Sequence, residues 1–445
     1  MIKYNYYLKL YDLAKKTRAK HYFEFFLQTP AWSKQELNRY RLSRLKSLLT
    51  HAYANCPYYR DAFDRAGIAV NDVRSLGDLQ YLPVLTREHI QNHLDTLLSA
   101  NKKQYKCFPG SSSGTAGIPI TYYHDGDGFG AGMAAVYLSY YLSGWQFGNR
   151  SLHIWGNSAS IKRWHSWGSR LKQWLFNQDN LDATLLNDRT HYPGIIDMIN
   201  RFKPLSIDGY TSSIYNLAQY IHETAAEIHR PNIVFTTAEN LFPYQLEAIE
   251  KELAPVSDIY GCGEINGIAV RPIHTNKYYI MEPHVIVETE SYPDSGLHEI
   301  IVTDLDNRVM PYIRYKPGDF IDPIQANDVP GNIKYDFFTK VNGRCSDILE
   351  LRNGRKIAAV TLVGGTAIRE IPGIMKHKVI WDGNCLHFVF ETDAHFNLAL
   401  ATQKVRESIS AYEHDLKFKI EPVKHILPDK TGKFKYFENQ QPVQP

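Results

Sequence analysis

Hydrophobic residues recur at helical spacing near the start of the chain. Between residues 35 and 65, Leu42, Leu45, Leu48 and Leu49 fall on one side of a helix whose other positions include Arg and Lys. This spacing predicts amphipathic helices that pack an apolar stripe on a larger body. A basic helix of this kind can also lie on a membrane surface, but the acidic residues that follow favour the core-facing interpretation.

From residue 82 onward, helical and strand-like patterns alternate. Residues 87–100 have a helical pattern after Thr86, whose hydroxyl suits an N-cap, whereas residues 152–156 and 232–240 are short and rich in β-formers. Such alternation predicts a layered α/β architecture.

The second half of the chain predicts a hairpin and then a separate small unit. Residues 284–290 and 298–305 are strand-like and flank the turn-rich segment 291–296, which is typical of a β-hairpin. We divide the chain after this region, into a large multi-layer α/β domain over residues 1–340 and a small domain over residues 341–445.

The small domain is predicted to be α+β. Asn353-Gly354 and Asp382-Gly383 are two-residue turns between strand-like segments, and residues 401–414 have a helical pattern. Since no long linker precedes these elements, we expect the two domains to lie close together.

Composition limits the class of partner. The 445 residues include 50 basic and 47 acidic ones, a formal charge of +3, which is too balanced to predict a nucleic-acid partner. The five cysteines lack metal-ligand spacing, and we expect neither a signal peptide nor a membrane span, since Lys3, Asn5 and Lys9 interrupt the N-terminal apolar residues and no later apolar run is long enough. We therefore expect a cytoplasmic protein that acts on a small molecule, and we leave open whether it forms a homodimer.

The segment GSSSGTAGIP, residues 110–119, is rich in hydroxyl groups and glycine. Backbone N–H groups of such a loop can converge on an anion, and Ser and Thr add donors, which predicts a phosphate-binding loop. Gly110, Ser112 and Gly114 also satisfy the G-x-S-x-G pattern of a hydrolase nucleophile. Because residues 118–123 alternate in β fashion instead of beginning a helix, a serine hydrolase is the less favoured alternative.

Later segments supply further candidates. In DIYGCGEING the ring of Tyr260 could stack on a base, and the Glu264 carboxylate could hold Mg²⁺. The other candidates are Asp319 in RYKPGDF, then Arg344 and Asp347, and finally Lys433 in LPDKTGKFK. Taken singly, each is more often a core, capping or surface residue, so their common order along the chain is the stronger observation.

In this order and spacing, the segments resemble the core motifs of the adenylate-forming superfamily, which includes acyl-coenzyme A synthetases, firefly luciferase and nonribosomal peptide adenylation domains. The chain is most similar to the phenylacetate-coenzyme A ligase branch, particularly its members associated with capsular polysaccharide synthesis. The similarity extends from about Leu37 to about Lys435 and is carried by YANCPYYRDAF, SSSGTAGIP, FTTAEN, RYKPGDF and LPDKTGK.

The resemblance implies an adenylating domain with a small mobile lid domain, and the use of ATP and Mg²⁺. A carboxylic acid would be converted to its acyl adenylate, and the acyl group would pass to coenzyme A or to an amine or hydroxyl of a sugar or amino acid. The acid would bind among residues 145–237, where His153, Trp155 and Tyr210 are candidates. A scaffold that binds nucleotide without catalysis is a further alternative.

The resemblance also assigns roles to individual residues. Ala238, Glu239 and Gly261 would lie on the adenine side, with Tyr260 stacked on the ring. The residues that would wrap the phosphates are Ser111, Ser112, Ser113, Gly114, Thr115 and Gly117.

The remaining roles concern charge. Glu264 would hold Mg²⁺, Asp319 would bind the ribose hydroxyls with Arg344 beside it, and Asp347 would lie at the hinge. Lys433 would bridge the substrate carboxylate and the α-phosphate.

Four positions depart from the superfamily pattern. Ile120 and Gly263 stand where lysine and threonine are common, and Pro317 replaces another threonine. Glu350 occupies a position where lysine is frequent, in a loop that helps to guide pantetheine in thioester-forming members.

Overall fold

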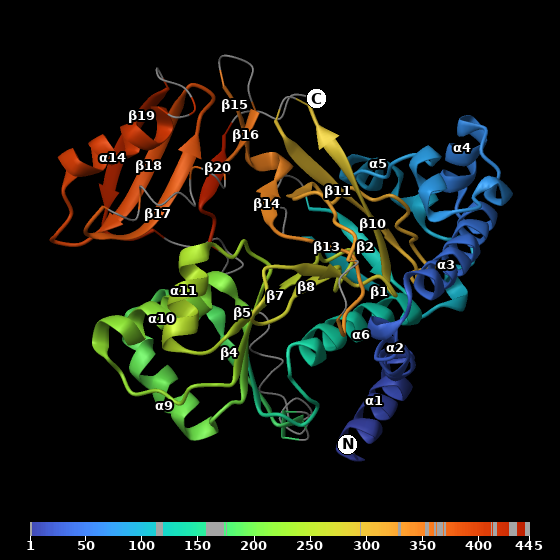
Figure 1. The fold of residues 1–445 in the computed structure, drawn as a ribbon, viewed down its shortest axis with the longest axis horizontal. Helices are drawn as coiled ribbons and strands as arrows, with labels where there is room; N and C mark the ends of the chain where they lie inside the picture. Colours follow the sequence, from blue (N-terminus) through green and yellow to red (C-terminus); the bar gives the residue numbers. More distant parts are fainter. Residues whose placement is uncertain are drawn as a thin grey trace.

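The computed structural model describes most of the chain, and Figure 1 shows how its elements are arranged. The described residues are 2–112, 119–156, 173–174, 176–293, 295–327, 331–351, 356–359, 362, 368, 371–410, 412, 416–426 and 434–440. Within these ranges, no helix combines the length and apolar character needed to cross a bilayer.

An eight-stranded sheet forms the centre of the large domain. Its strand order is β13–β9–β8–β7–β6–β5–β3–β4, and the neighbours from β7 to β4 are parallel. The strands are β3 (Ser151–Trp155), β4 (Gln178–Asp182), β5 (Ser206–Tyr210), β6 (Ile233–Thr237), β7 (Val256–Tyr260), β8 (Ala269–Arg271), β9 (Tyr278–Ile280) and β13 (Phe337–Phe338).

Helices cover both faces of this sheet (Figure 1). The helices on one face are α9 (Tyr192–Phe202), α10 (Thr211–Thr224) and α11 (Pro243–Glu252), and those on the other are α6 (Gly126–Leu142) and α2 (Ala19–Phe26). Val234 packs with the first group and the next residue, Phe235, with the second, because successive strand residues point to opposite faces. The predicted α/β class is confirmed.

A second, antiparallel sheet of order β10–β11–β12–β14 packs with the N-terminal helices. Its core contains Leu45, Leu48 and Leu49, so three of the four leucines of the predicted stripe face the interior, and Leu42 is half-buried. The expected hairpin is also present, since β10 pairs with β11 along its whole length. The bounds are β10 (Val285–Tyr292), β11 (Leu297–Asp304), β12 (Asp319–Ile321), β14 (Val341–Arg344), α1 (Ile2–Lys15), α3 (Lys34–Asn55), α4 (Pro57–Ala66) and α5 (Arg87–Leu97), the last capped by Thr86 as predicted.

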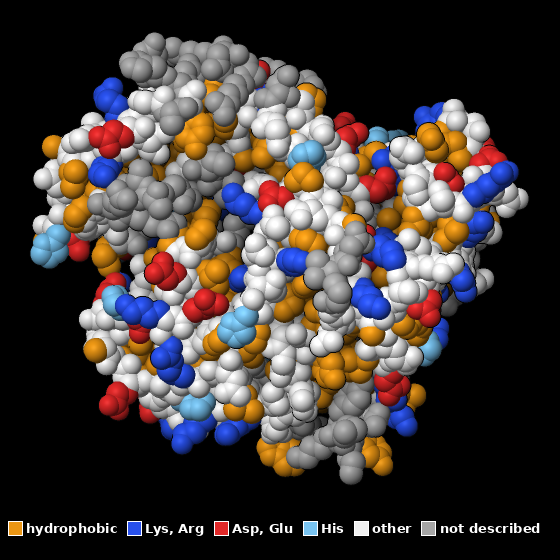
Figure 2. Space-filling model, in the orientation of Figure 1, with side chains coloured by type: hydrophobic (Ala, Val, Ile, Leu, Met, Phe, Trp, Pro, Cys, Tyr) orange, Lys and Arg blue, Asp and Glu red, His pale blue; other side chains and the backbone are white. Residues whose placement is uncertain are grey.

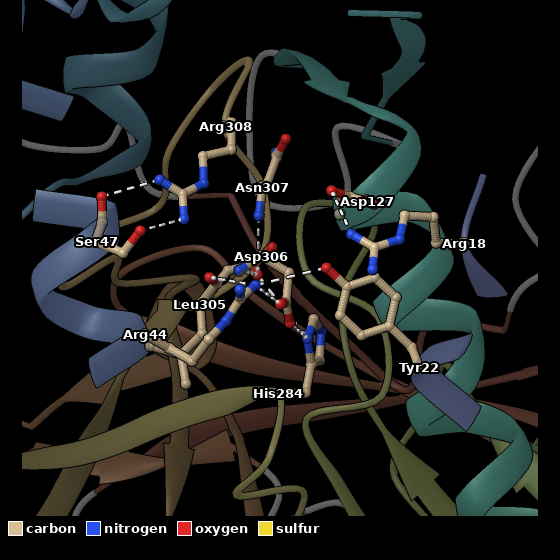
Figure 3. A network of polar contacts seen from close by, with 12 residues as sticks. Arg18, Tyr22, Arg44, Ser47, Asp127, His284, Leu305, Asp306, Asn307 and Arg308 are labelled. Atoms are coloured by element: carbon tan, nitrogen blue, oxygen red, sulfur yellow. Dashed lines mark hydrogen bonds and ion pairs between the residues drawn. The ribbon is translucent and has the colours of Figure 1, made fainter. Parts of the chain in front are cut away.

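A buried polar network joins the N-terminal helices to the end of β11 (Figure 3). Asp306 accepts a hydrogen bond from Nδ1 of His284 at 2.9 Å and pairs with the guanidinium of Arg44 on α3. Burial opposes a charge on His284, but Asp304 and Asp306 outweigh it and raise the pKa of this histidine. These groups neutralise one another, so although His284, Asp304 and Asp306 lie close enough to share a cation, we interpret them as an internal ion-pair cluster.

The small domain has a hydrophobic core of its own, built from residues between Leu349 and Phe437. Its elements are β15 (Ile348–Glu350), β16 (Lys356–Ala358), β17 (Ile374–Trp381), β18 (Cys385–Thr392), α14 (Leu398–Ser410), β19 (Lys417–Val423) and β20 (Phe437–Asn439). The predicted turn at Asp382-Gly383 joins β17 to β18, whereas Asn353-Gly354 lies outside the described residues. Because β14 still pairs with β12, we propose that the chain crosses between domains at residues 345–347.

Charges of both signs are interspersed on the face of the molecule shown in Figure 2. Among the coloured side chains of that view, Lys and Arg do not gather into one patch. This distribution agrees with the net charge of +3.

Candidate active site

A cavity of about 560 Å³ lies where the carboxyl ends of β6 and β7 meet the small domain. Ligands of open α/β sheets bind at this edge, beyond the carboxyl ends of the strands. Seven residues selected from the sequence line it, namely Ala238, Glu239, Tyr260, Gly261, Asp319, Arg344 and Asp347. Residues far apart in the sequence therefore share one cavity.

Tyr260, Asp319 and Arg344 form a connected group in the cavity wall. The hydroxyl of Tyr260 donates to Oδ2 of Asp319 at 2.9 Å, and Nε of Arg344 lies 3.5 Å from Oδ1. Burial raises the pKa of Asp319, and the charge of Arg344 opposes this rise. The ring of Tyr260 is held edge-on by Phe338, so the aromatic face and the carboxylate are fixed relative to each other.

Glu239 links the start of α10 to the C-terminal tail. Its carboxylate accepts hydrogen bonds from the backbone N–H of Ser212 at 2.7 Å and from that of Phe434 at 3.1 Å. Tyr436 is held in turn by the side-chain amide of Gln245 at 2.8 Å. Lys433 lies outside the described residues, but the residue that follows it is anchored at the cavity wall.

The hydroxyl-rich segment lies in sequence between two short antiparallel strands, β1 (Phe108–Ser111) and β2 (Thr121–His124). Ser111 ends β1, whereas Ser113, Gly114, Thr115 and Gly117 lie outside the described residues. Oγ of Ser112 accepts hydrogen bonds from the backbone N–H of Ile120 at 3.0 Å and from Nη2 of Arg87 at 2.9 Å. Neither donor can act as a general base, and the next described residues, 119–124, lead into strand β2, so the hydrolase alternative is not favoured.

Glu264 lies beside this loop and not in the wall of the 560 Å³ cavity. Its buried carboxylate receives Nη1 of Arg87 at 3.0 Å and the hydroxyl of Tyr315 at 3.1 Å. Arg87 thus bridges the serine of the predicted phosphate loop and the predicted metal ligand. Sequence reasoning missed Arg87 because an arginine at the first position of a helix is usually a solvated charge.

Curated proteins and solved structures resemble the chain over most of its length. No protein-family model matches the chain. It is 23% identical to Protein CapK of Staphylococcus aureus over 80% of this chain and 77% of that one, and 26% identical to phenylacetate-coenzyme A ligase of Escherichia coli (strain K12) over 72% and 74%. A phenylacetate-coenzyme A ligase of Aromatoleum evansii is 25% identical over 72% and 73%.

Among solved structures, 2-hydroxyisobutyryl-CoA ligase in the postadenylation state matches with a TM-score of 0.71 and 16% identity, over 93% of this chain and 91% of that one. The chain shares the fold of this ligase, and the curated proteins similar to it in sequence are phenylacetate-coenzyme A ligases and Protein CapK. For the same ligase in its thioesterification state the TM-score falls to 0.58. The chain therefore superposes better on the first of these two structures than on the second.

The fold explains two departures from the superfamily pattern. Ile120 is 2% exposed and belongs to the core under the N-terminal helices, where the charge of a lysine would be desolvated. At Gly263, an added Cβ would lie only 2.7 Å from the hydroxyl of Tyr122. Tyr122 thus fills the space that a threonine side chain would need.

Proposed function

We propose that the chain is an AMP-forming carboxylate ligase, which converts a carboxylic acid to its acyl adenylate with ATP and then transfers the acyl group to coenzyme A. The observation that carries this proposal is the shared cavity. Tyr260 and Asp319 enter it from the large domain, and Phe434, the neighbour of Lys433, enters it from the small one. A nucleotide held there would face a cation from the tail.

The adenosine of ATP would occupy the cavity of about 560 Å³, a size typical of ligand pockets. The ring of Tyr260 offers an apolar face for the base, beside the backbone of Ala238 and Gly261. Asp319 offers acceptor oxygens for the ribose hydroxyls, with its charge balanced by Arg344. Glu239 would act mainly as a positioning residue, since Ser212 and Phe434 already donate to it.

The phosphates would lie between the hydroxyl-rich loop and Glu264. One carboxylate completed by phosphate oxygens is an ordinary Mg²⁺ environment, so the buried Glu264 fits that role. When bound, Mg²⁺ would polarise the phosphate oxygens. Arg87 supplies a cation at this point. We propose that it contacts the phosphates in place of the lysine that is common at the position of Ile120.

The reaction needs neutralisation of charge more than a base. An oxygen of the substrate carboxylate attacks the α-phosphorus, the acyl adenylate forms and pyrophosphate leaves, so negative charges converge in the transition state. Lys433 would be placed to stabilise that charge. In the second step the thiolate sulfur attacks the acyl carbon, a thioester forms and AMP leaves. Closure by the small domain would exclude water, which otherwise hydrolyses the anhydride.

The experiment is acid-dependent pyrophosphate release, measured over a panel of carboxylic acids and followed by addition of acceptors. We expect AMP and pyrophosphate only when an acid is present, and a thioester when coenzyme A is added. Transfer to an amine or hydroxyl acceptor instead would retain the first step and change the second. Binding of ATP without pyrophosphate release under any acid would favour the scaffold alternative.

The cellular setting is also a proposal. We place the enzyme in the cytoplasm, where ATP and coenzyme A are available. A role in polysaccharide synthesis follows from the resemblance noted in the sequence.

A further inference from the structure

A second cavity, of about 390 Å³, lies beneath α6 on the opposite side of the sheet from α9 and α10. On β3, Leu152 and Ile154 pack in the core that α9 and α10 share with the sheet. The alternate residues Ser151, His153 and Trp155 line the cavity on the other face. A central parallel strand covered on both faces is normally apolar on both. Here one face carries Ser151, His153 and Trp155, each of which has a polar hydrogen-bonding atom.

The polar face continues across the neighbouring strands. His153 is the register partner of Asn180 on β4 and of Asp208 on β5, so three side chains form one row across the sheet. Ser151 pairs in the same way with Gln178. Burying such groups costs free energy unless each finds a hydrogen-bond partner, and a row of them facing a cavity is typical of a binding surface.

Asp208 is 3% exposed, and three donors already engage its carboxylate. Its carboxylate pairs with Nδ1 of His153, accepts Nε1 of Trp155 at 2.8 Å and accepts the hydroxyl of Tyr140. A carboxylate with three donors has little capacity left for an ammonium group of a ligand. Asp208 therefore positions its neighbours and does not select a cationic substrate.

The remaining polar lining consists of carboxamides. Gln173, Gln178, Asn180 and Asn266 line the cavity and are half-buried, and each amide offers both donors and an acceptor. Aromatic side chains, among them Trp145, form the opposite wall. Carboxamides facing aromatic rings suit a neutral ligand with several hydroxyl or amide groups, because the amides bond the polar groups while the rings pack on its apolar faces.

The cavity reaches the activation centre through one loop. Asn266 lies two residues after Glu264 and in contact distance of α6 at Gly132. On the other side, Trp155 packs edge-on against Tyr210, which precedes the α10 residues that hold Glu239. A ligand in this cavity would thus lie beside both the predicted metal ligand and the wall of the nucleotide cavity.

We infer that this cavity takes the acyl group of the substrate. We also infer that this acyl group is uncharged and bears several hydroxyl or amide groups, so that the substrate is not an arylacetic acid. The inference rests on the proposed ligase function. The row of Asn180, His153 and Asp208 would be the specificity-determining surface.

The test compares acids that share a skeleton and differ in hydroxylation. Acid-dependent pyrophosphate release is measured for hexanoate against gluconate, for cyclohexanecarboxylate against quinate, and for phenylacetate and an aminocyclohexanecarboxylate. We expect the hydroxylated member of at least one pair to have the higher kcat/KM, by about tenfold or more. The ammonium-bearing acid should be a poor substrate.

Variants locate the preference in the cavity. Asn180→Leu should reduce kcat/KM for the preferred hydroxylated acid by about tenfold while leaving the KM for ATP unchanged. Gln178→Leu repeats the test if Asn180→Leu does not fold, and Gln403→Leu on the exposed face of α14 is the matched control.

Two results overturn the inference alone: a preference for the unsubstituted acid in both pairs or for phenylacetate, or an unchanged preference in the two cavity variants. If no acid, in this set or in a wider panel, gives pyrophosphate release, the ligase function fails and the inference fails with it.

Discussion

Replacing Arg87 by alanine is the most informative single perturbation of the site. Its guanidinium lies 2.9 Å from Oγ of Ser112 and 3.0 Å from the carboxylate of Glu264. Without ATP, it neutralises a buried acid. With ATP bound, we expect the phosphates to take over its charge while Glu264 turns to Mg²⁺. The variant should therefore be impaired in both states, for different reasons.

The magnitude follows from the kind of contact. Arg87 has a quarter of its side chain exposed, so its contacts are partly screened but not those of a free surface charge. A hydrogen bond to a charged group contributes about 1.5–3 kcal/mol, which corresponds to about 10- to 150-fold in kcat/KM for ATP. Arg87→Lys keeps the charge but loses the second donor, and we expect an intermediate loss.

The assay is ATP–pyrophosphate exchange at saturating acid, combined with thermal unfolding with and without Mg²⁺. Arg87→Ala leaves Glu264 buried without its cation, at a cost of about 1–3 kcal/mol, so the melting temperature should fall and Mg²⁺ should restore part of it. Arg39→Ala, at an exposed position of α3, is the control. A kcat/KM for ATP within about twofold of the parent would refute the role given to Arg87.

Further predictions concern the ribose contact and the buried network. Asp319→Asn should raise the KM for ATP by about tenfold or more. Tyr260→Phe keeps the ring and removes only the hydroxyl bonded to Asp319, so it should change this KM by less than about threefold. Equal effects of the two variants would contradict the assignment of Asp319 to the ribose. Because the folded-state pKa of His284 is raised, its stabilisation is complete below an unfolded value near 6.5 and is lost as the pH rises through the folded value. His284→Asn should thus lower the melting temperature more near pH 6 than near pH 9, while the exposed control His395→Gln should show no such difference.

Local patterns predicted the elements that depend on local chemistry. Thr86 caps α5 as its hydroxyl suggested, and the turn at Asp382-Gly383 joins two strands. The hairpin around residues 291–296 follows from alternation flanking a turn. The cavity residues could be found because each belongs to a short motif in a fixed order, although no one of them is distinctive alone.

Other features depend on contacts between distant segments and left no local signal. Arg87 pairs with Glu264, which lies 177 positions away in the sequence. The residues around Arg87 give no local signal of such a distant partner. Gly263 is explained only by Tyr122, which comes from the hairpin of the phosphate loop. The polar face of β3 is visible as alternation in the sequence, but its cavity exists only because α6 covers it.

The variant Lys433→Met tests whether the tail lysine assists adenylation. Acid-dependent ATP–pyrophosphate exchange and ATP affinity are measured for this variant and for Lys424→Met, an exposed control upstream. We expect Lys433→Met to lower the exchange rate by about two orders of magnitude or more while ATP still binds nearly as before, because the charge acts in the transition state. Exchange at the parent rate in Lys433→Met would contradict this expectation.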